Sequence, residues 1–160
     1  QATQDLIKAW WRKIGVDTEL KAINSSVFFD SAPGNTDNTA HFYADIQMYT
    51  NGTDQPDPTN YFAAWTTKEI AQKSNEWRGQ NFHRWSNPEY DKLVDQLRTE
   101  LDPAKRKDLI IKLNDLIVNE VVTIPLVSRA TPASGKAKDL KGNIPNSWDS
   151  ELWDIANWYR

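Results

Sequence analysis

The chain has 160 residues with 19 basic and 22 acidic side chains, giving a formal net charge of −3, and it contains no cysteine. This length fits one domain or one compact lobe, and the lack of thiols excludes disulfides and thiolate metal sites. No basic block is present, so nucleic acid is not an expected partner, and no apolar run approaches the ~18 residues of a membrane-spanning helix. The two histidines, His41 and His83, match no metal-binding spacing, so we expect neither a metal nor another cofactor.

Aromatic residues are abundant, with eight Trp, five Tyr and five Phe. A Trp side chain is large and has one N–H group that needs a partner when it is buried. Eight of them are more than a lobe of this size needs for its core. Two interpretations follow: some Trp side chains line a cleft or a surface that another domain covers, or all of them serve as core and half-exposed packing.

The first 22 residues predict a helix followed by a strand. The helix, over 1–14, has one apolar face made of Leu6, Ile7, Trp10 and Ile14. Gly15 is placed to end it. Apolar and charged residues then alternate over 16–22, which is typical of a half-buried strand. Because the chain opens inside a helix without a Met or a signal peptide, we expect a fragment from which a first strand and a preceding lobe are missing.

The next part of the chain predicts a second strand with an irregular loop after it. A short helix is expected over 25–30, followed by a polar surface loop. Alternation over 42–49 predicts the strand. Residues 50–58, TNGTDQPDP, include a glycine and two prolines, which forbid a regular helix or a central strand. A second short helix is expected over 60–65.

Residues 87–120 predict a helical hairpin. Asn87 and Asp102 are capping residues, and each is followed by a proline that suits the first helical turn. Apolar residues recur at helical spacing in both helices: Tyr90, Leu93, Val94, Leu97 and Leu101, then Leu109, Ile110, Leu113, Leu116 and Ile117. The basic run 105–107 is expected on a solvated helix face. The apolar, β-rich residues 121–127 predict one more buried strand.

The order of these motifs resembles the C-terminal lobe of the peptide/nickel class of ABC-importer solute-binding proteins. The shared pattern is Asn-Pro-Glu-Tyr-Asp, an amphipathic helix, Asp-Pro-Ala-Lys-Arg, a second helix and Val-Thr-Ile-Pro-Leu. The resemblance implies an α/β fold: one lobe of a two-lobed periplasmic-binding-protein-like fold, with a small mixed sheet flanked by helices that include the hairpin 87–120. It assigns 1–129 to the C-terminal ligand-binding lobe, truncated at its N-terminus. Residues 130–160 are then a tail that returns to the missing first lobe.

The loop 50–58 is the candidate ligand site. A loop that leaves a sheet places backbone N–H and C=O groups at the mouth of a cleft, where they can pair with an extended peptide. Asp54 adds a carboxylate, and such a group can anchor a ligand ammonium. Oligopeptide- and dipeptide-binding proteins have a similar loop, Asp, acidic-Pro pair and aromatic helix. This resemblance implies that Asp54 receives a peptide α-ammonium and that Asn51, Gly52 and Thr53 offer main-chain hydrogen bonds.

The loop departs from the family pattern at two positions. Asn51 stands where the family usually has Trp, and Met48 stands where some oligopeptide binders have an arginine that meets a carboxylate. The same scaffold also serves nickel complexes, oligosaccharides and opine-like compounds, and Asn51 can hydrogen-bond a sugar or an amide. Asp54 has a structural alternative, because Asx turns are common before proline. The identity of the ligand therefore stays open.

Other side chains near this loop in the sequence have both a ligand-binding and a structural interpretation. Asp57 before Pro58 fits a turn or a cap, and Trp65 fits the core. Trp77 and Trp85 flank a loop that can overhang the cleft, and we place both among the ligand-binding residues, with packing as the alternative. Arg84 suits a surface salt bridge better than an anionic ligand.

The resemblance implies the solute-binding component of an ABC importer, which is not an enzyme. In that family two lobes close on a peptide or a similar small solute, and the closed form docks on a membrane permease. The protein is then exported, as a periplasmic protein or a cell-surface lipoprotein. This chain supplies one wall of the site, so we expect little or no ligand affinity when it is isolated.

Two other classes of function are considered. Trp platforms with Asp54 and Asp57 suggest a carbohydrate-binding or glycoside-hydrolase-like domain, although two acids three residues apart on one loop are poorly placed to flank a sugar. The tail suggests a structural interaction domain, and it permits a homodimer. The aromatic residues behind this second alternative are Trp148, Trp153 and Trp158.

Overall fold

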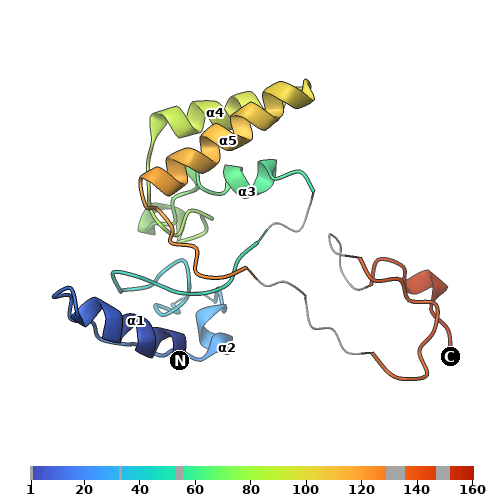
Figure 1. Cartoon of the computed structure of the whole chain (residues 1–160), viewed down its shortest axis with the longest axis horizontal. Coiled ribbons are helices and arrows are strands. Elements are labelled where there is room, and N and C mark those ends of the chain that lie inside the picture. Colours follow the sequence, from blue (N-terminus) through green and yellow to red (C-terminus); the bar gives the residue numbers. More distant parts are fainter. Residues whose placement is uncertain (1, 33, 53–55, 129–135, 147–151) are drawn as a thin grey trace. The chain divides into compact units, whose positions relative to one another are not determined.

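The structure is a computed structural model that describes residues 2–32, 34–52, 56–128, 136–146 and 152–160. The chain divides into two compact units, residues 1–47 and residues 48–160 (Figure 1). Regular structure in the described residues is helical. Two isolated bridges accompany the helices, a parallel one between Ile70 and Asn81 and an antiparallel one between Lys141 and Tyr159.

The three segments expected as strands, 16–22, 42–49 and 121–127, do not form strands. Alternation of apolar and polar residues specifies which side of a strand would be buried, but a strand also needs a neighbour for its backbone hydrogen bonds. None of the three segments pairs with another within the ranges described. The individual strand predictions are therefore wrong here, while the α/β lobe with its small mixed sheet stays a prediction.

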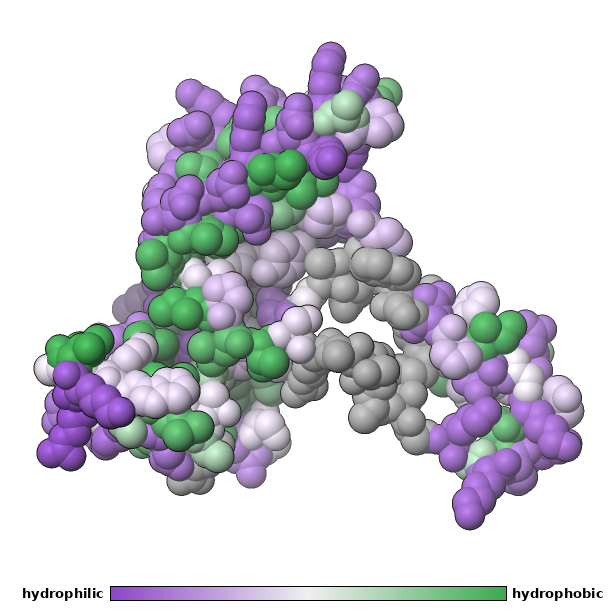
Figure 2. All heavy atoms as spheres, viewed as in Figure 1, coloured by the Kyte–Doolittle hydropathy of each residue, from purple (hydrophilic) through white to green (hydrophobic). Residues whose placement is uncertain are grey.

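The first unit is built on two helices, α1 (Ala2–Arg12) and α2 (Ser25–Phe28). Gly15 follows α1 with a φ of +86°, a backbone conformation that favours glycine. Asn24 caps α2, because its side chain accepts a hydrogen bond from the Ser26 amide at 2.9 Å. No residue of α1 is buried. Figure 2 shows several hydrophobic areas on the surface. The large apolar side chains of this unit that are exposed are Leu6, Trp10, Ile14, Val16, Leu20, Val27, Phe29, Tyr43 and Ile46.

The second unit contains the helical hairpin that the sequence predicts. Asn87 accepts hydrogen bonds from the amides of Glu89 and Tyr90, and Asp102 does so from Ala104 and Lys105. Both predicted caps are confirmed. The elements of this unit are α3 (Thr59–Ala63), η1 (Thr67–Glu69), η2 (Lys73–Asn75), α4 (Pro88–Thr99), α5 (Pro103–Asn119) and η3 (Ile155–Asn157).

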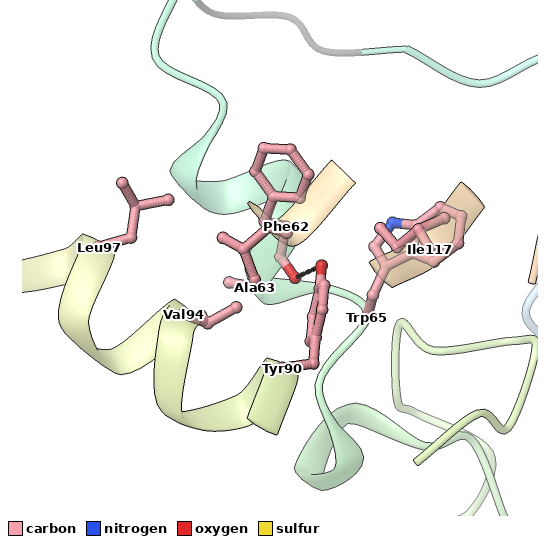
Figure 3. Close-up of a cluster of buried hydrophobic side chains, with 8 residues drawn as sticks. Phe62, Ala63, Trp65, Tyr90, Val94, Leu97 and Ile117 are labelled. Atoms are coloured by element: carbon pink, nitrogen blue, oxygen red, sulfur yellow. Dashed lines mark hydrogen bonds between the residues drawn. The ribbon is translucent and has the colours of Figure 1, made fainter. Parts of the chain in front are cut away.

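The core of the second unit lies where α3, α4 and α5 meet (Figure 3). Its buried members are Phe62, Ala63, Trp65, Tyr90, Val94, Leu97, Leu113 and Ile117. The predicted apolar stripes of both hairpin helices supply most of them. Leu101 was predicted as part of the apolar stripe of α4 but does not belong to the core. It lies beyond the end of α4, in the turn to α5, and is 89% exposed.

The described part of the tail is held together by its own residues. Lys141 and Tyr159 exchange two backbone hydrogen bonds, at 2.9 and 3.1 Å. The Asp154 carboxylate is buried and accepts hydrogen bonds from the Ile144 amide and the Trp158 indole. Trp148 lies outside the described residues. A homodimer through this tail stays a prediction.

Candidate functional site

The start of the candidate ligand loop is open to solvent. Asn51 and Gly52 are both exposed, and the Gly52 amide donates a hydrogen bond to the Asn51 side chain at 2.9 Å. A Cβ atom added to Gly52 would meet no atom of the described residues within 4 Å. The Gly52 amide, one of the predicted main-chain donors, thus already has a hydrogen-bond partner in the neighbouring residue. It lies in a part of the backbone that a ligand can approach. Thr53 and Asp54 lie outside the described residues, so their predicted roles stay predictions.

The far end of the same loop is fixed by Asp57, Thr59 and Arg106, a set we call the Asp57 clamp. One Asp57 carboxylate oxygen accepts hydrogen bonds from the Thr59 amide, at 2.9 Å, and from the Thr59 hydroxyl. Arg106 Nη2 donates to the other carboxylate oxygen and to Thr59 Oγ1. The hydrogen bonds from Thr59, with a further contribution from Arg106, lower the pKa of Asp57.

This geometry confirms the structural interpretation of Asp57 as a turn or cap residue. Both of its carboxylate oxygens are occupied by groups of the same chain. The glycoside-hydrolase alternative, which uses Asp57 as one of two carboxylates, stays a prediction.

Arg106 also closes the C-terminal end of α4. Its Nη1 donates to the carbonyl oxygens of Leu97, at 2.8 Å, and Glu100, at 2.9 Å. The last carbonyls of a helix have no partner within the helix, and a cationic side chain suits them. The side chain is 22% exposed, so the expectation of a solvated basic run is wrong for Arg106. The sequence held one signal: the Asp102 cap sets where α5 begins, which places residue 106 one turn into α5, beside the end of α4.

The loop between α3 and α4 is organised by Asn81, which sequence reasoning missed. Asn81 is 1% exposed, and its side-chain amide nitrogen donates to the carbonyls of Trp65, Thr66 and Trp85 at 2.9, 3.2 and 2.8 Å. The Asn81 backbone amide donates to Glu69 O at 2.7 Å. One short side chain thereby joins both ends of this loop. Residue type alone does not mark such an asparagine as buried.

The two tryptophans predicted to bind ligand lie in this loop and contact different partners. The Trp85 indole N–H donates to the Glu120 carboxylate at 2.7 Å, and the ring packs edge-on against Tyr90. Trp77 is half-buried, and the Arg84 guanidinium carbon lies 5.3 Å from the centre of its ring. Trp85 thus ties the loop to the end of α5, which is a packing role. Ligand binding by either residue stays a prediction.

Trp65 is a buried residue, whereas Arg84 is exposed and contacts residues of the same loop. Trp65 is 7% exposed, as expected for a core residue, and the His83 ring stacks on it with the ring centres 4.4 Å apart. Burial lowers the pKa of His83. Arg84 donates from Nε to the Ala71 carbonyl at 3.2 Å, in addition to lying over Trp77. The surface salt bridge expected for Arg84 stays a prediction.

The hairpin carries one open depression of about 350 Å³ near the turn between α4 and α5. Its lining combines two acidic and two basic side chains with neutral ones, so it favours no single ligand charge. The lining residues are Gln96, Thr99, Glu100, Lys105, Asp108, Leu109 and Lys112. None of them is a predicted ligand-binding residue. Across the described ranges, no group of three or more His, Cys, Asp or Glu side chains is arranged to hold a metal ion.

Comparison with known proteins relates the chain to an oligopeptide-binding protein. The relative is the oligopeptide-binding protein OppA of Bacillus subtilis (strain 168), which is 30% identical over 128 residues, or 79% of this chain. The match covers 20% of that protein, so the chain spans about a fifth of the length of the curated relative it matches. No protein-family model matches the chain, and no solved structure does. Among the described helices, none combines the length and the hydropathy that a membrane span requires.

Proposed function

We propose that this chain forms one lobe of the solute-binding component of an ABC importer and takes part in binding a peptide between two lobes. The observation that carries the proposal is the 30% identity to OppA over 79% of the chain. The full protein then delivers its ligand to a membrane permease, from the periplasm or from the cell surface as a lipoprotein. The predicted α/β lobe, 1–129, and the returning tail, 130–160, belong to the same proposal.

The candidate loop supplies groups suited to a peptide. Asp54 is proposed to receive the α-ammonium, and the exposed backbone at Asn51 and Gly52, with Thr53, to pair with the main chain of the ligand. Support comes from the two ends of this loop: its start is open to solvent, while its end is held by the Asp57 clamp. A peptide binds more tightly to a loop that is fixed beforehand, because less conformational freedom is lost on binding.

The exposed apolar side chains of residues 1–47 agree with a lobe whose surface another part of the protein covers. Soluble monomers rarely expose large contiguous apolar patches without a partner. Trp10, Phe29 and Ile46 are 57, 60 and 61% exposed. In the proposal, the first lobe supplies this cover.

A chimera tests the proposal. The region of B. subtilis OppA that matches this chain is replaced by the chain, and the purified chimera is titrated with a pool of tri- to pentapeptides by calorimetry. We expect micromolar peptide binding by the chimera and little or none by the isolated 160-residue chain. A chimera that unfolds cooperatively but binds no peptide contradicts the proposed function. Micromolar binding by the isolated chain contradicts the one-wall arrangement.

A matched pair of variants tests the site within that chimera. Asp54→Asn removes the carboxylate proposed to meet the ligand ammonium, and truncating one partner of such a pair costs roughly 2–5 kcal/mol of binding free energy. Asp95→Asn makes the same chemical change at an exposed position of α4 and should leave the affinity unchanged. Equal peptide affinities for the two variants would remove Asp54 from the site.

A further inference from the structure

We infer that Arg106 is a positioning residue that holds the C-terminal end of the loop 50–58 in place on the helical hairpin. The consequence of this for ligand binding rests on the proposed function. The anchoring itself rests only on the contacts of Arg106, and it extends the site to a residue of α5 that lies 49 positions from Asp57 in the sequence.

Two terminal nitrogens of one side chain join three helices. Nη1 donates to the carbonyls of Leu97 and Glu100 at the end of α4, and Nη2 donates to Asp57 and Thr59 at the start of α3. Arg106 itself stands in the first turns of α5, where its amide donates to the Asp102 carbonyl at 2.9 Å. The position of Asp57 is thus set by the hairpin as well as by its own neighbours.

The arrangement depends on the shape of the arginine side chain more than on its charge. Asp57 is 57% exposed, and an ion pair open to solvent contributes little by itself. A planar guanidinium can donate to four acceptors at fixed angles, whereas a lysine ammonium is a single point of charge with three donors. Lysine at this position should therefore keep the attraction to Asp57 and lose part of the geometry.

The clamp acts on the ligand loop through the chain itself. Asp54 precedes Asp57 by three residues, a stretch that spans at most about 10 Å when fully extended. The position of Asp57 therefore restricts the positions that Asp54 can reach, and a displacement of Asp57 changes them. At Gly52 itself, an added Cβ would meet no atom of the described residues within 4 Å.

The first experiment measures amide hydrogen exchange in the 160-residue chain and needs no ligand. Arg106→Met should speed exchange of the Thr59 amide about tenfold or more, the change expected when a charge-assisted hydrogen-bond set is lost. Amides in the middle of the hairpin, such as those of Val94 and Leu113, should keep their rates. Lys107→Met, which removes the same charge one residue away at an exposed position, is the control.

Arg106→Lys is a second variant, which keeps the inference testable if Arg106→Met does not fold. It keeps the charge and should give an exchange rate for Thr59 between those of the unmodified chain and Arg106→Met. An unchanged Thr59 rate in both Arg106 variants would overturn the inference. So would equal acceleration of the Thr59, Val94 and Leu113 amides, because that pattern means general loss of stability and no anchoring.

The second experiment measures peptide affinity in the chimera described above. Arg106→Met should weaken binding about tenfold at a temperature where the chimera remains fully folded, and Arg106→Lys should restore part of the loss. Adding Asp57→Asn to Arg106→Met should cause no further loss, because the two residues act together. If the unmodified chimera binds no peptide, the proposed function fails, and the exchange rates alone decide the role of Arg106. Unchanged affinity in Arg106→Met would overturn the link between the clamp and the ligand.

Discussion

The hydroxyl of Tyr90 donates a hydrogen bond to the carbonyl oxygen of Phe62 across 2.9 Å, and it does so inside the core (Figure 3). The bond joins the first turn of α4 to α3, which lies 28 residues earlier in the chain. Burial raises the pKa of Tyr90, so the phenol keeps its proton as the donor. The contact makes α3 part of the hairpin core and not an independent turn of helix.

Tyr90→Phe should lower the free energy of unfolding by about 1 kcal/mol, the usual net value of one buried hydrogen bond. The aromatic ring, and with it most of the packing, is retained. Urea denaturation followed by circular dichroism measures the change. Tyr159→Phe is the control at a 60% exposed side chain and should change stability by less than about 0.5 kcal/mol. A loss as small as that of the control would show that the Phe62 carbonyl finds another donor.

Asn81→Ala should lower the free energy of unfolding by roughly 2 kcal/mol, because the two N–H groups of the side-chain amide, which three carbonyls share, lose hydrogen bonds of about 1 kcal/mol each. Asn81→Asp should be worse, since it places a carboxylate oxygen against the carbonyls that now accept from the amide. The control is Asn114→Ala on the exposed face of α5. Thermal and urea unfolding of the three variants check the order.

Stability should depend on the protonation of His83. Its pKa is lowered in the folded state by burial, while an unfolded chain has a value of about 6.5. Near pH 7 and above, the imidazole is neutral in both states. As the pH falls below about 6.5, the unfolded chain takes up the proton first, so the free energy of unfolding decreases. His83→Phe keeps a ring against Trp65 and should flatten the slope between about pH 7 and pH 5.

His41→Phe is the control for this experiment because it retains His83. Urea midpoints at closely spaced pH values give the slope for each variant. Equal slopes for His83→Phe and the unmodified chain would show that protonation of His83 does not affect folding.

Gly79→Ala should destabilise the second unit by about 2 kcal/mol or more, as forced overpacking does. An added Cβ would run into the Glu69 carbonyl oxygen and lie 2.8 Å from the Ala71 amide nitrogen, both rigid backbone atoms. Gly52→Ala is the matched control, since no atom from the described part of the chain lies within 4 Å of its Cβ position. It should be neutral or stabilising by about 0.4–1 kcal/mol, because alanine restricts the unfolded chain. Urea midpoints for both variants decide the comparison.

The parts of the fold that were predicted correctly depend on signals close together in the sequence. Asn87 and Asp102 each cap a helix through amides two or three residues away, and their prolines follow directly. Helical spacing likewise identified the buried residues of α4 and α5. Leu101 was misplaced because periodicity continues past the residue at which the helix ends. The strand segments failed because a strand is completed by a neighbour that its own residues do not specify.

The contacts that shape the candidate site were harder to predict because their partners are distant in sequence. Arg106 binds Asp57 and Thr59 from 49 and 47 residues away, and Asn81 reaches Trp65 from 16. A basic run on an amphipathic helix is usually solvated, and a lone asparagine in a polar loop is usually exposed. The sequence therefore predicted exposed side chains at both positions, whereas tertiary contacts bury Asn81 and partly bury Arg106. The ligand chemistry of Asp54 still depends on the family resemblance.

The hairpin also indicates an order of folding. Only three residues, Glu100 to Asp102, separate α4 from α5, so bringing these helices together closes a very short loop and costs little chain entropy. Docking α3 requires the whole segment from Phe62 to Tyr90 to close, which is slower by the same reasoning. The hairpin is therefore the expected nucleus, and the residues around α3, with the loop that precedes it, acquire their native arrangement last.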